Sequence, residues 1–392
     1  MKNKNLLIIA LIALVNMLGY GIIIPILYSY SKKFGLSDFQ NGLLFATFSI
    51  CQFISTPIIG RLSDKYGRRP LLLISIVGTA ASFFTMAFAP NFIFLFVARA
   101  LDGLTAGNIP VAFAVISDST QPEERPKAFG LIGAAFNFGF VFGPAVSALT
   151  VGFGTSVPFI IAGVITMIAV ILTYLYLPET NKHMGEVKEG KLFDFGKMWH
   201  TLFDPNVGVT FVISLIFFLA FSCAVIYGFQ PFLVQVLKIS TQQNAMLFTL
   251  FGVVGLISQT FLVQFFSKKF GMKNSFTFSI LFTAIAFVIM FLSHSVVTFV
   301  IASIILGIFN SVAQTLIPTI LSQETDERSQ GTMQGLNSSY QSIGMIVGPL
   351  LGGAVATISI PSTFVVGAIL IFFCFLLSFC VMRVGVKKES AF

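Results

Sequence analysis

A pair of opposite charges lies within an apolar stretch of the sequence. Arg99 and Asp102 interrupt a run that is otherwise mostly apolar from Phe92 to Ile116. Residues three apart on a helix lie on one face, so these two side chains are expected to be neighbours. Desolvation of a buried charge pair can cost more than the pairing returns. A pair that is kept in such a run therefore indicates a function.

Three interpretations of the pair stay open. In the first, protonation of Asp102 frees Arg99 to bind an anionic group of a substrate, and deprotonation recaptures Arg99 and releases that group. In the second, the two charges neutralise each other within the fold. In the third, they bind a substrate without proton coupling. We favour the first, because Asp102 alone among the 15 acidic residues lies deep in an apolar segment, while all three histidines lie in loops or at segment ends.

The composition is that of a membrane protein. The chain has 392 residues, of which 56% are hydrophobic and 10% are charged, whereas soluble domains carry about 25% charged residues. The net charge is +8, but no clustered basic face is visible, so we expect no nucleic-acid partner. The four cysteines lie in apolar runs without zinc-site spacing. We therefore expect no metal and no cofactor.

Twelve stretches are apolar and long enough to span a bilayer, which takes about 20 residues per helix. The first follows a basic N-terminus and has no cleavage site, so we interpret it as an uncleaved spanning helix. The approximate ranges are 6–29, 40–62, 71–90, 92–117, 128–149, 157–177, 207–230, 244–266, 275–293, 296–320, 332–356 and 361–382.

The longest polar stretch separates the sixth span from the seventh. It divides the chain into a first half at 1–177, a central loop at 178–206 and a second half at 207–392. Of the 23 Lys and Arg, 19 fall in loops on the side of the N-terminus and three on the other side. Because basic loops stay in the cytoplasm, we expect both termini and the central loop there, with the chain in the inner membrane.

The two halves repeat each other. SDKYGRR at 63–69 is similar to SKKFGMK at 267–273, and GFVFGPAVSA at 139–148 is similar to GMIVGPLLGG at 344–353. EER at 123–125 is similar to DER at 326–328. The sequence thus predicts an all-α integral membrane protein with twelve transmembrane helices in two pseudo-symmetric six-helix halves. Such repeats, with a site between them near the midplane, are typical of alternating-access transporters.

Several motifs carry a resemblance to a known family. GRLSDKYGRRP at 60–70 resembles the loop between helices two and three of the major facilitator superfamily. The glycines and proline of helices one and five, and Arg99 with the glycines of helix four, resemble its twelve-helix drug:proton antiporter branch, which includes tetracycline and multidrug efflux proteins. These residues are Gly19, Gly21, Pro25, Gly103, Gly107, Gly139, Gly143 and Pro144.

The resemblance implies a gating role for the loop and for helix five. Asp64 and Arg68 would form a latch on the cytoplasmic side, with Asp118 pairing to the same basic loop. The bend in helix five is associated with export in this family, although a plain packing face of small residues is the alternative. The residues assigned to gating are Gly60, Asp64, Gly67, Arg68, Arg69, Asp118, Gly139, Gly143 and Pro144.

Helices one, four, seven and ten line the cavity in this family, so polar residues on them are the predicted substrate contacts. A hydrogen bond between helices is the alternative for each. They are Arg99, Asn16, Tyr20, Asn108, Tyr227, Asn310 and Gln314. Neutral amides, tyrosines and many phenylalanines suit an amphiphilic ligand. Asn16 stands where related drug exporters often have an acid, which favours neutral, zwitterionic or anionic substrates over cations.

We therefore predict a monomeric secondary transporter, and not an enzyme, that exports an amphiphilic, drug-like small molecule in exchange for protons. Its partners would be the substrate, protons and the lipid bilayer. Export of an endogenous metabolite, such as a siderophore or another organic anion, is the main alternative, and uptake by symport is a third. A polytopic membrane enzyme would need clustered His, Asp, Ser or Cys at one membrane face, and the sequence has no such cluster. A phosphate-binding loop for ATP is also absent from the sequence.

Overall fold

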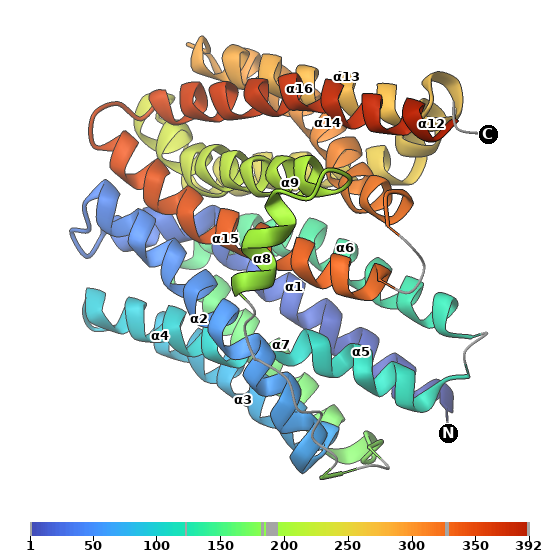
Figure 1. Cartoon of the computed structure of the whole chain (residues 1–392). Helices are drawn as coiled ribbons and strands as arrows, with labels where there is room; N and C mark the ends of the chain where they lie inside the picture. The colour runs from blue at the N-terminus through green and yellow to red at the C-terminus, as the bar shows by residue number, and fades with distance from the viewer. Residues whose placement is uncertain (1, 122–123, 182–183, 186–194, 326–328, 390–392) are drawn as a thin grey trace. The chain divides into compact units, whose positions relative to one another are not determined.

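The computed structural model describes residues 2–121, 124–181, 184–185, 195–325 and 329–389 (Figure 1). Every element in these ranges is helical, and eleven segments in them are long and apolar enough to cross a membrane. Each of the eleven coincides with a predicted span to within a few residues. The remaining span, predicted at 332–356, lies in α15 (Gln330–Ala356), a helix of sufficient length whose first turns are rich in Gln, Asn and Ser.

The chain forms two compact units. Unit 1 comprises Met1–Leu36, Thr47–Phe193 and Ser240–Thr249, and unit 2 comprises Ser37–Ala46, Asp194–Ile239 and Leu250–Phe392. Each unit thus includes a short segment from the other half of the sequence. Glu123 and 326–328 of the shortest predicted repeat lie outside the described residues, as do 182–183 and 186–194 of the predicted central loop.

In the first half of the sequence, α1 packs against α6 and α7, and α3 packs against α4 and α7. Apolar side chains of α1, α3, α5, α6 and α7 form one buried cluster, in which Ile9, Leu72 and Ile132 are fully buried. The helices are α1 (Lys2–Lys32), α2 (Asp38–Tyr66), α3 (Arg68–Ala87), α4 (Phe92–Thr105), α5 (Asn108–Ser119), α6 (Arg125–Thr150), η1 (Val151–Phe153) and α7 (Val157–Tyr176).

In the second half, α9 packs against α15 and α16, and α13 packs against α14 and α16 (Figure 1). The turns η2, η3 and η4 are π-helical, a form that is often found at functional sites. The helices are α8 (Phe195–Leu202), α9 (Gly208–Phe221), η2 (Ser222–Gly228), α10 (Phe229–Pro231), η3 (Phe232–Val236), α11 (Thr241–Ile257), η4 (Ser258–Leu262), α12 (Val263–Phe270), α13 (Met272–Phe291), α14 (Val296–Gln323), α15 and α16 (Ser362–Glu389).

The packing follows the internal repeat. The pair α1–α6 corresponds to α9–α15, and the pair α3–α7 corresponds to α13–α16. The starts of α2 and α11 form a further repeat that the sequence comparison did not identify. In each, a serine and a glutamine exchange hydrogen bonds as a capping box: Ser37 with Gln40 at 2.8 and 3.2 Å, and Ser240 with Gln243 at 3.0 and 3.2 Å. The prediction of two pseudo-symmetric halves is confirmed.

The fourth span differs in detail from its prediction. It was expected as one helix over 92–117, but α4 ends at Thr105 and α5 begins at Asn108. Glycine is a poor helix former, and Gly103 and Gly107 flank the break. A Cβ at Gly103 would contact the backbone of Phe48, and one at Gly107 would lie 2.6 Å from the side chain of Ile59. The two glycines thus allow the span to approach α2 closely at the point where the helix is interrupted.

Helix α8 was not predicted. It lies within 178–206, which the sequence analysis interpreted as a polar loop. Met198 and Thr201 of this helix are buried, and Met198 belongs to an apolar cluster with Phe211, Leu321 and Tyr340. The central segment therefore contains a helix that belongs to unit 2 and packs against the other helices of that unit.

Candidate functional site

Arg99 and Asp102 lie together in α4, and both are buried in unit 1. Their exposed fractions are 2% and 7%, and Arg99 Nη1 lies 3.5 Å from Asp102 Oδ2. This distance fits an ion pair but exceeds that of an ordinary hydrogen bond. Within the described chain, Nε and Nη1 of Arg99 make no hydrogen bond. Buried donors in this state are rare in folded proteins and are available to a ligand.

An aromatic ring lies against the guanidinium, and a second ring packs on the first. The ring of Phe48, on α2, lies 4.4 Å from Arg99 Cζ, within the range of a cation–π contact. Tyr20, on α1, packs against Phe48 with 5.8 Å between ring centroids. The hydroxyls of Thr79 and Ser82, on α3, lie beside the Asp102 carboxylate. The pair therefore lies where α1, α2, α3 and α4 meet, with one charged group against rings and the other against hydroxyls.

Asn16 and Asn108, both predicted substrate contacts, bind each other. Asn16 Nδ2 donates to Asn108 Oδ1 at 2.9 Å, and Asn108 Nδ2 donates to Asn16 Oδ1 at 3.2 Å. This reciprocal amide pair joins α1 to α5 directly after the break in the fourth span. It corresponds to the helix-to-helix alternative that the sequence analysis left open.

The predicted substrate contacts of the second half, Tyr227, Asn310 and Gln314, all lie in unit 2. The Tyr227 hydroxyl donates to the backbone oxygen of Asp38 at 2.8 Å, so this group is engaged at the start of α2. Asn310 is buried, and its Oδ1 makes no hydrogen bond within the described chain. Gln314, one helical turn further along α14, is half-buried. Asn310 thus offers a buried acceptor.

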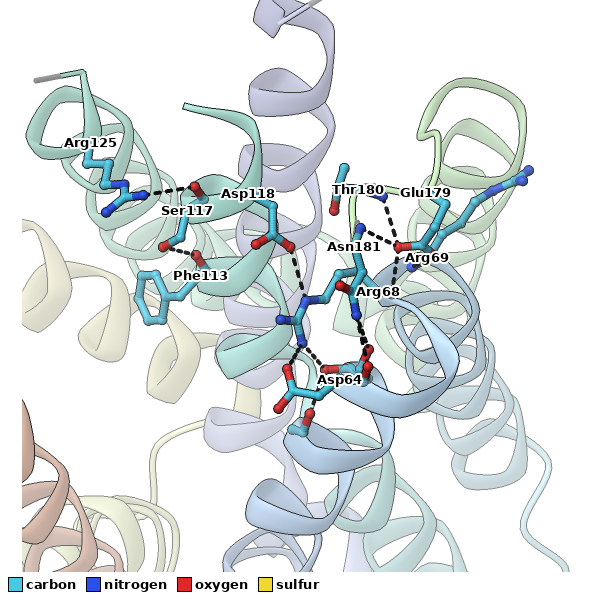
Figure 2. A network of polar contacts seen from close by, with 12 residues as sticks. Asp64, Arg68, Arg69, Phe113, Ser117, Asp118, Arg125, Glu179, Thr180 and Asn181 are labelled. Atoms are coloured by element: carbon cyan, nitrogen blue, oxygen red, sulfur yellow. Dashed lines mark hydrogen bonds and ion pairs between the residues drawn. The ribbon is translucent and has the colours of Figure 1, made fainter. Parts of the chain in front are cut away.

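The residues assigned to the latch form a connected network (Figure 2). Arg68 Nη1 lies 2.5 Å from Asp64 Oδ1, and Arg68 Nε lies 3.2 Å from Asp118 Oδ2. One guanidinium therefore holds the end of α2 to the end of α5. Gly67 has a φ of +102°, which favours glycine between α2 and α3. A Cβ at Gly60 would meet nothing within 4 Å, so packing does not require a glycine there.

Glu179 completes this network and was missed by the sequence analysis. It follows α7, and its carboxylate accepts hydrogen bonds from the backbone N–H groups of Arg68 at 2.9 Å and Arg69 at 3.1 Å (Figure 2). These are unsatisfied first N–H groups of α3, where a negative charge also favours the helix dipole. Arg69 Nη2 donates to the backbone oxygen of Tyr174 at 2.6 Å. The only sequence signal was an acid directly after the sixth span, on the same side as Arg68.

The glycines of α6 form a close contact with α1. A Cβ at Gly143 would lie 2.6 Å from the backbone oxygen of Leu18, and one at Gly139 would lie 2.6 Å from that of Leu14. Pro144 lies against Gly21 of α1 in the same contact. The Cβ of any other residue at either position would meet backbone atoms, so the motif produces two helices in near backbone contact.

Comparison with known proteins agrees with this architecture. A tetracycline resistance protein, class H, from Pasteurella multocida is 29% identical over 360 residues, which cover 89% of this chain and 88% of that protein. Multidrug resistance protein 1 of Bacillus subtilis (strain 168) is 29% identical over 363 residues, covering 92% and 91%. These similarities extend over nearly the whole of both chains.

A solved structure shares the fold at low sequence identity. It is a bacterial homologue of the human lysosomal transporter Spinster, in an inward-facing and unoccupied conformation. It has a TM-score of 0.78 and 18% identity, and it covers 98% of each chain. The sequence profile of the Major Facilitator Superfamily matches residues 9–255 and 211–392. The resemblance first identified in the loop at 60–70 is therefore confirmed, and the chain belongs to the Major Facilitator Superfamily.

Proposed function

We propose that this membrane transporter exports an amphiphilic small molecule by proton-coupled alternating access. The observation that carries the proposal is the buried guanidinium of Arg99, which has N–H groups without hydrogen-bond partners within the described chain and lies beside Asp102 and an aromatic ring on which a second ring packs. Such a site binds an anionic or polar group of a ligand through the donors and its apolar body through the rings. The names of the relatives, tetracycline and multidrug resistance proteins, support an amphiphilic drug-like substrate.

In this proposal Asp102 is the coupling group. When Asp102 is ionised, it attracts Arg99 and competes with the ligand for the same guanidinium. When Asp102 is protonated, this competition is lost and Arg99 binds the ligand. Protonation of Asp102 and ligand binding to Arg99 thus favour the same state of the pair, so each changes the affinity for the other, which is the requirement for coupling. The protein would work as a monomer in the inner membrane with both termini in the cytoplasm.

The network of Asp64, Arg68 and Asp118 would act as the cytoplasmic latch of unit 1. It supports a gating role because one guanidinium bridges two carboxylates from different helices, and movement of the end of α5 away from the α2–α3 turn would break the contact to Asp118. The close contact of Gly139 and Gly143 with α1 would hold the fifth span against the first during that motion.

The test is transport of a tetracycline into and out of proteoliposomes, measured in two ways. Export driven by an imposed pH gradient requires coupling, whereas exchange of labelled for unlabelled substrate requires binding alone. We expect Asp102→Asn to lose gradient-driven export and keep exchange, and Arg99→Ala to lose both. Glu124→Gln removes an exposed carboxylate at the start of α6 and is the matched control. Full gradient-driven export by Asp102→Asn would refute the coupling role.

The site also favours a second candidate, a dedicated exporter of an endogenous organic anion. Arg99 supplies the cation for such a ligand, and the spans offer no second buried carboxylate in the described residues to bind a cationic drug. Competition in the exchange assay separates the candidates. Organic anions that compete better than tetracycline would favour metabolite export, and competition by lipophilic cations would argue against both.

A further inference from the structure

Helix α8 has three distinct faces. Positions four apart lie about 40° apart around a helix axis, so residues i, i+4 and i+8 share a face. Phe195, Trp199 and Phe203 have this spacing, with Phe203 directly after the last turn of the helix. Met198 and Thr201 lie on a second face, and Lys197 and His200 lie on a third. The first face is therefore aromatic, the second is buried, and the third is polar and exposed.

The second face attaches α8 to the rest of unit 2. The Tyr340 hydroxyl donates a hydrogen bond to the backbone oxygen of Met198 at 2.5 Å, and it lies 3.1 Å from Thr201 Oγ1. Met198 also packs in the buried cluster with Phe211 and Leu336. These contacts fix the rotation of α8, so the directions of its other two faces are fixed as well.

The aromatic face is largely exposed in the part of the chain that the structure describes. Phe195, Trp199 and Phe203 are 61%, 64% and 70% exposed, and the rings of Trp199 and Phe203 lie 5.3 Å apart. Three adjacent exposed aromatic side chains form an apolar patch of the kind that marks an interaction surface. Lys197 and His200, on the third face, are exposed polar side chains that suit contact with water.

The position of α8 in the chain indicates what covers this patch. Asp204 follows Phe203, and its backbone oxygen accepts a hydrogen bond at 2.9 Å from the N–H of Gly208, the first residue of the seventh span. The aromatic face therefore ends next to the place where the chain enters the membrane. Trp and other aromatic side chains are enriched at this boundary. Amphipathic helices also lie in it with their apolar face toward the acyl chains.

We propose that α8 is a lipid-binding helix, and that Phe195, Trp199 and Phe203 insert into the boundary between the headgroups and acyl chains of the bilayer. One face binds unit 2, one binds lipid and one faces water. This surface goes beyond the transport function proposed above and does not depend on the substrate or on proton coupling. Through the bond from Tyr340 to Met198, α15 would be tied to this lipid-binding helix.

The chain contains a natural probe for this proposal, because Trp199 is its only tryptophan. The full-length protein is reconstituted in phosphatidylcholine vesicles that carry bromine either near the headgroup end or near the end of the acyl chains. We expect Trp199 emission to be lost more strongly with the shallow bromine than with the deep one, and to resist acrylamide added in water. Emission quenched by acrylamide and not by bromine would overturn the proposal. Emission protected from both quenchers would show a protein cover and would also overturn it.

Two variants separate the lipid-facing surface from the rest of the helix. Phe203→Glu places a carboxylate on the aromatic face, and we expect it to reduce the loss of emission caused by the shallow bromine. His200→Glu places the same charge on the water face and should leave that loss unchanged. Equal behaviour of the two variants would overturn the assignment of the faces. The wild-type measurement needs neither variant, so a failure of Phe203→Glu to fold leaves the test intact.

Discussion

The contact between α6 and α1 predicts a difference between two glycines of one helix. A Cβ at Gly143 would lie 2.6 Å from the backbone oxygen of Leu18 and 2.7 Å from Gly21 Cα, whereas one at Gly133 would meet nothing within 4 Å. Both residues lie within α6. Gly143→Ala therefore forces two backbones apart, and Gly133→Ala adds a methyl group in open space.

The expected difference in stability between the two variants can be worked out because one contribution is common to both. Replacing glycine by alanine inside a helix gains about 1 kcal/mol of helix propensity in both cases, so this term cancels in the comparison. Excess volume in a close-packed contact costs about 1–3 kcal/mol. Backbone atoms cannot rotate away as a side chain does, so we place Gly143→Ala in the upper part of that range. Gly133→Ala should equal or exceed the wild type in stability.

The assay compares the two proteins after heating in detergent, as the fraction that remains monodisperse. We expect the midpoint for Gly143→Ala to fall by about 4–12 °C relative to Gly133→Ala, since about 1 kcal/mol shifts the midpoint of a large domain by about 2–4 °C and the cost is in the upper part of about 1–3 kcal/mol. The repeat offers the same comparison on α15. A Cβ at Gly348 would contact Ser222 Oγ, and one at Gly335 would meet nothing. Equal midpoints within both pairs would refute the reasoning about close backbone contact.

Three further predictions concern the networks of the first half. Glu179→Ala removes a carboxylate acceptor from the start of α3, so we expect the free energy of unfolding to fall by about 1.5–3 kcal/mol, as for a charge-assisted hydrogen bond. Hydrogen exchange of the backbone amides in the first turn of α3 should become faster; unchanged exchange there would contradict the cap. Arg68→Lys keeps the charge but not the planar fork that bridges Asp118 and a second carboxylate, so its transport rate should fall to that of Arg68→Ala, and a wild-type rate would count against the bridge. Asn16→Ala should lower the free energy of unfolding by about 1–3 kcal/mol by leaving the buried amide of Asn108 unpaired, and Asn108→Ala should cost less through this effect because Asn16 is only half-buried. The double variant should cost less than the sum of the two in a thermal unfolding cycle; additive losses would exclude the pair.

The spans and the pseudo-symmetry could be predicted because their signals are local or repeated. A run of about 20 apolar residues has few alternatives to a membrane helix. The packing of α1 on α6 and of α9 on α15 also matches the repeat of GFVFGPAVSA in GMIVGPLLGG. The break between α4 and α5 could not be placed in the same way. It depends on how closely Gly103 and Gly107 approach α2, which is a tertiary contact.

Glu179 and α8 show why the remaining features escaped prediction. The bond from Arg68 to Glu179 joins residues 111 positions apart, and the sequence does not indicate which helix start an acid after the sixth span will cap. Helix α8 has eight residues, too few for apolar periodicity to separate it from a loop. Its aromatic residues recur every four positions, from Phe195 to Phe203, and that spacing was the available signal.

The residues that carry the family resemblance in the fourth span are spaced so that they lie on one face of a helix, and this face packs against α2. Arg99, Gly103 and Gly107 are four apart, so in a regular helix they share a face, and here all three contact α2. The ring of Phe48 lies against Arg99, and the backbone of Phe48 would contact a Cβ at Gly103. Ser55 Oγ donates to the Gly103 backbone oxygen at 3.0 Å, which ties α2 to the turn before the helix break. The glycines that bring α2 and α4 together therefore also place the aromatic ring on the guanidinium, so the packing of these two helices and the geometry of the charged site are set by the same residues.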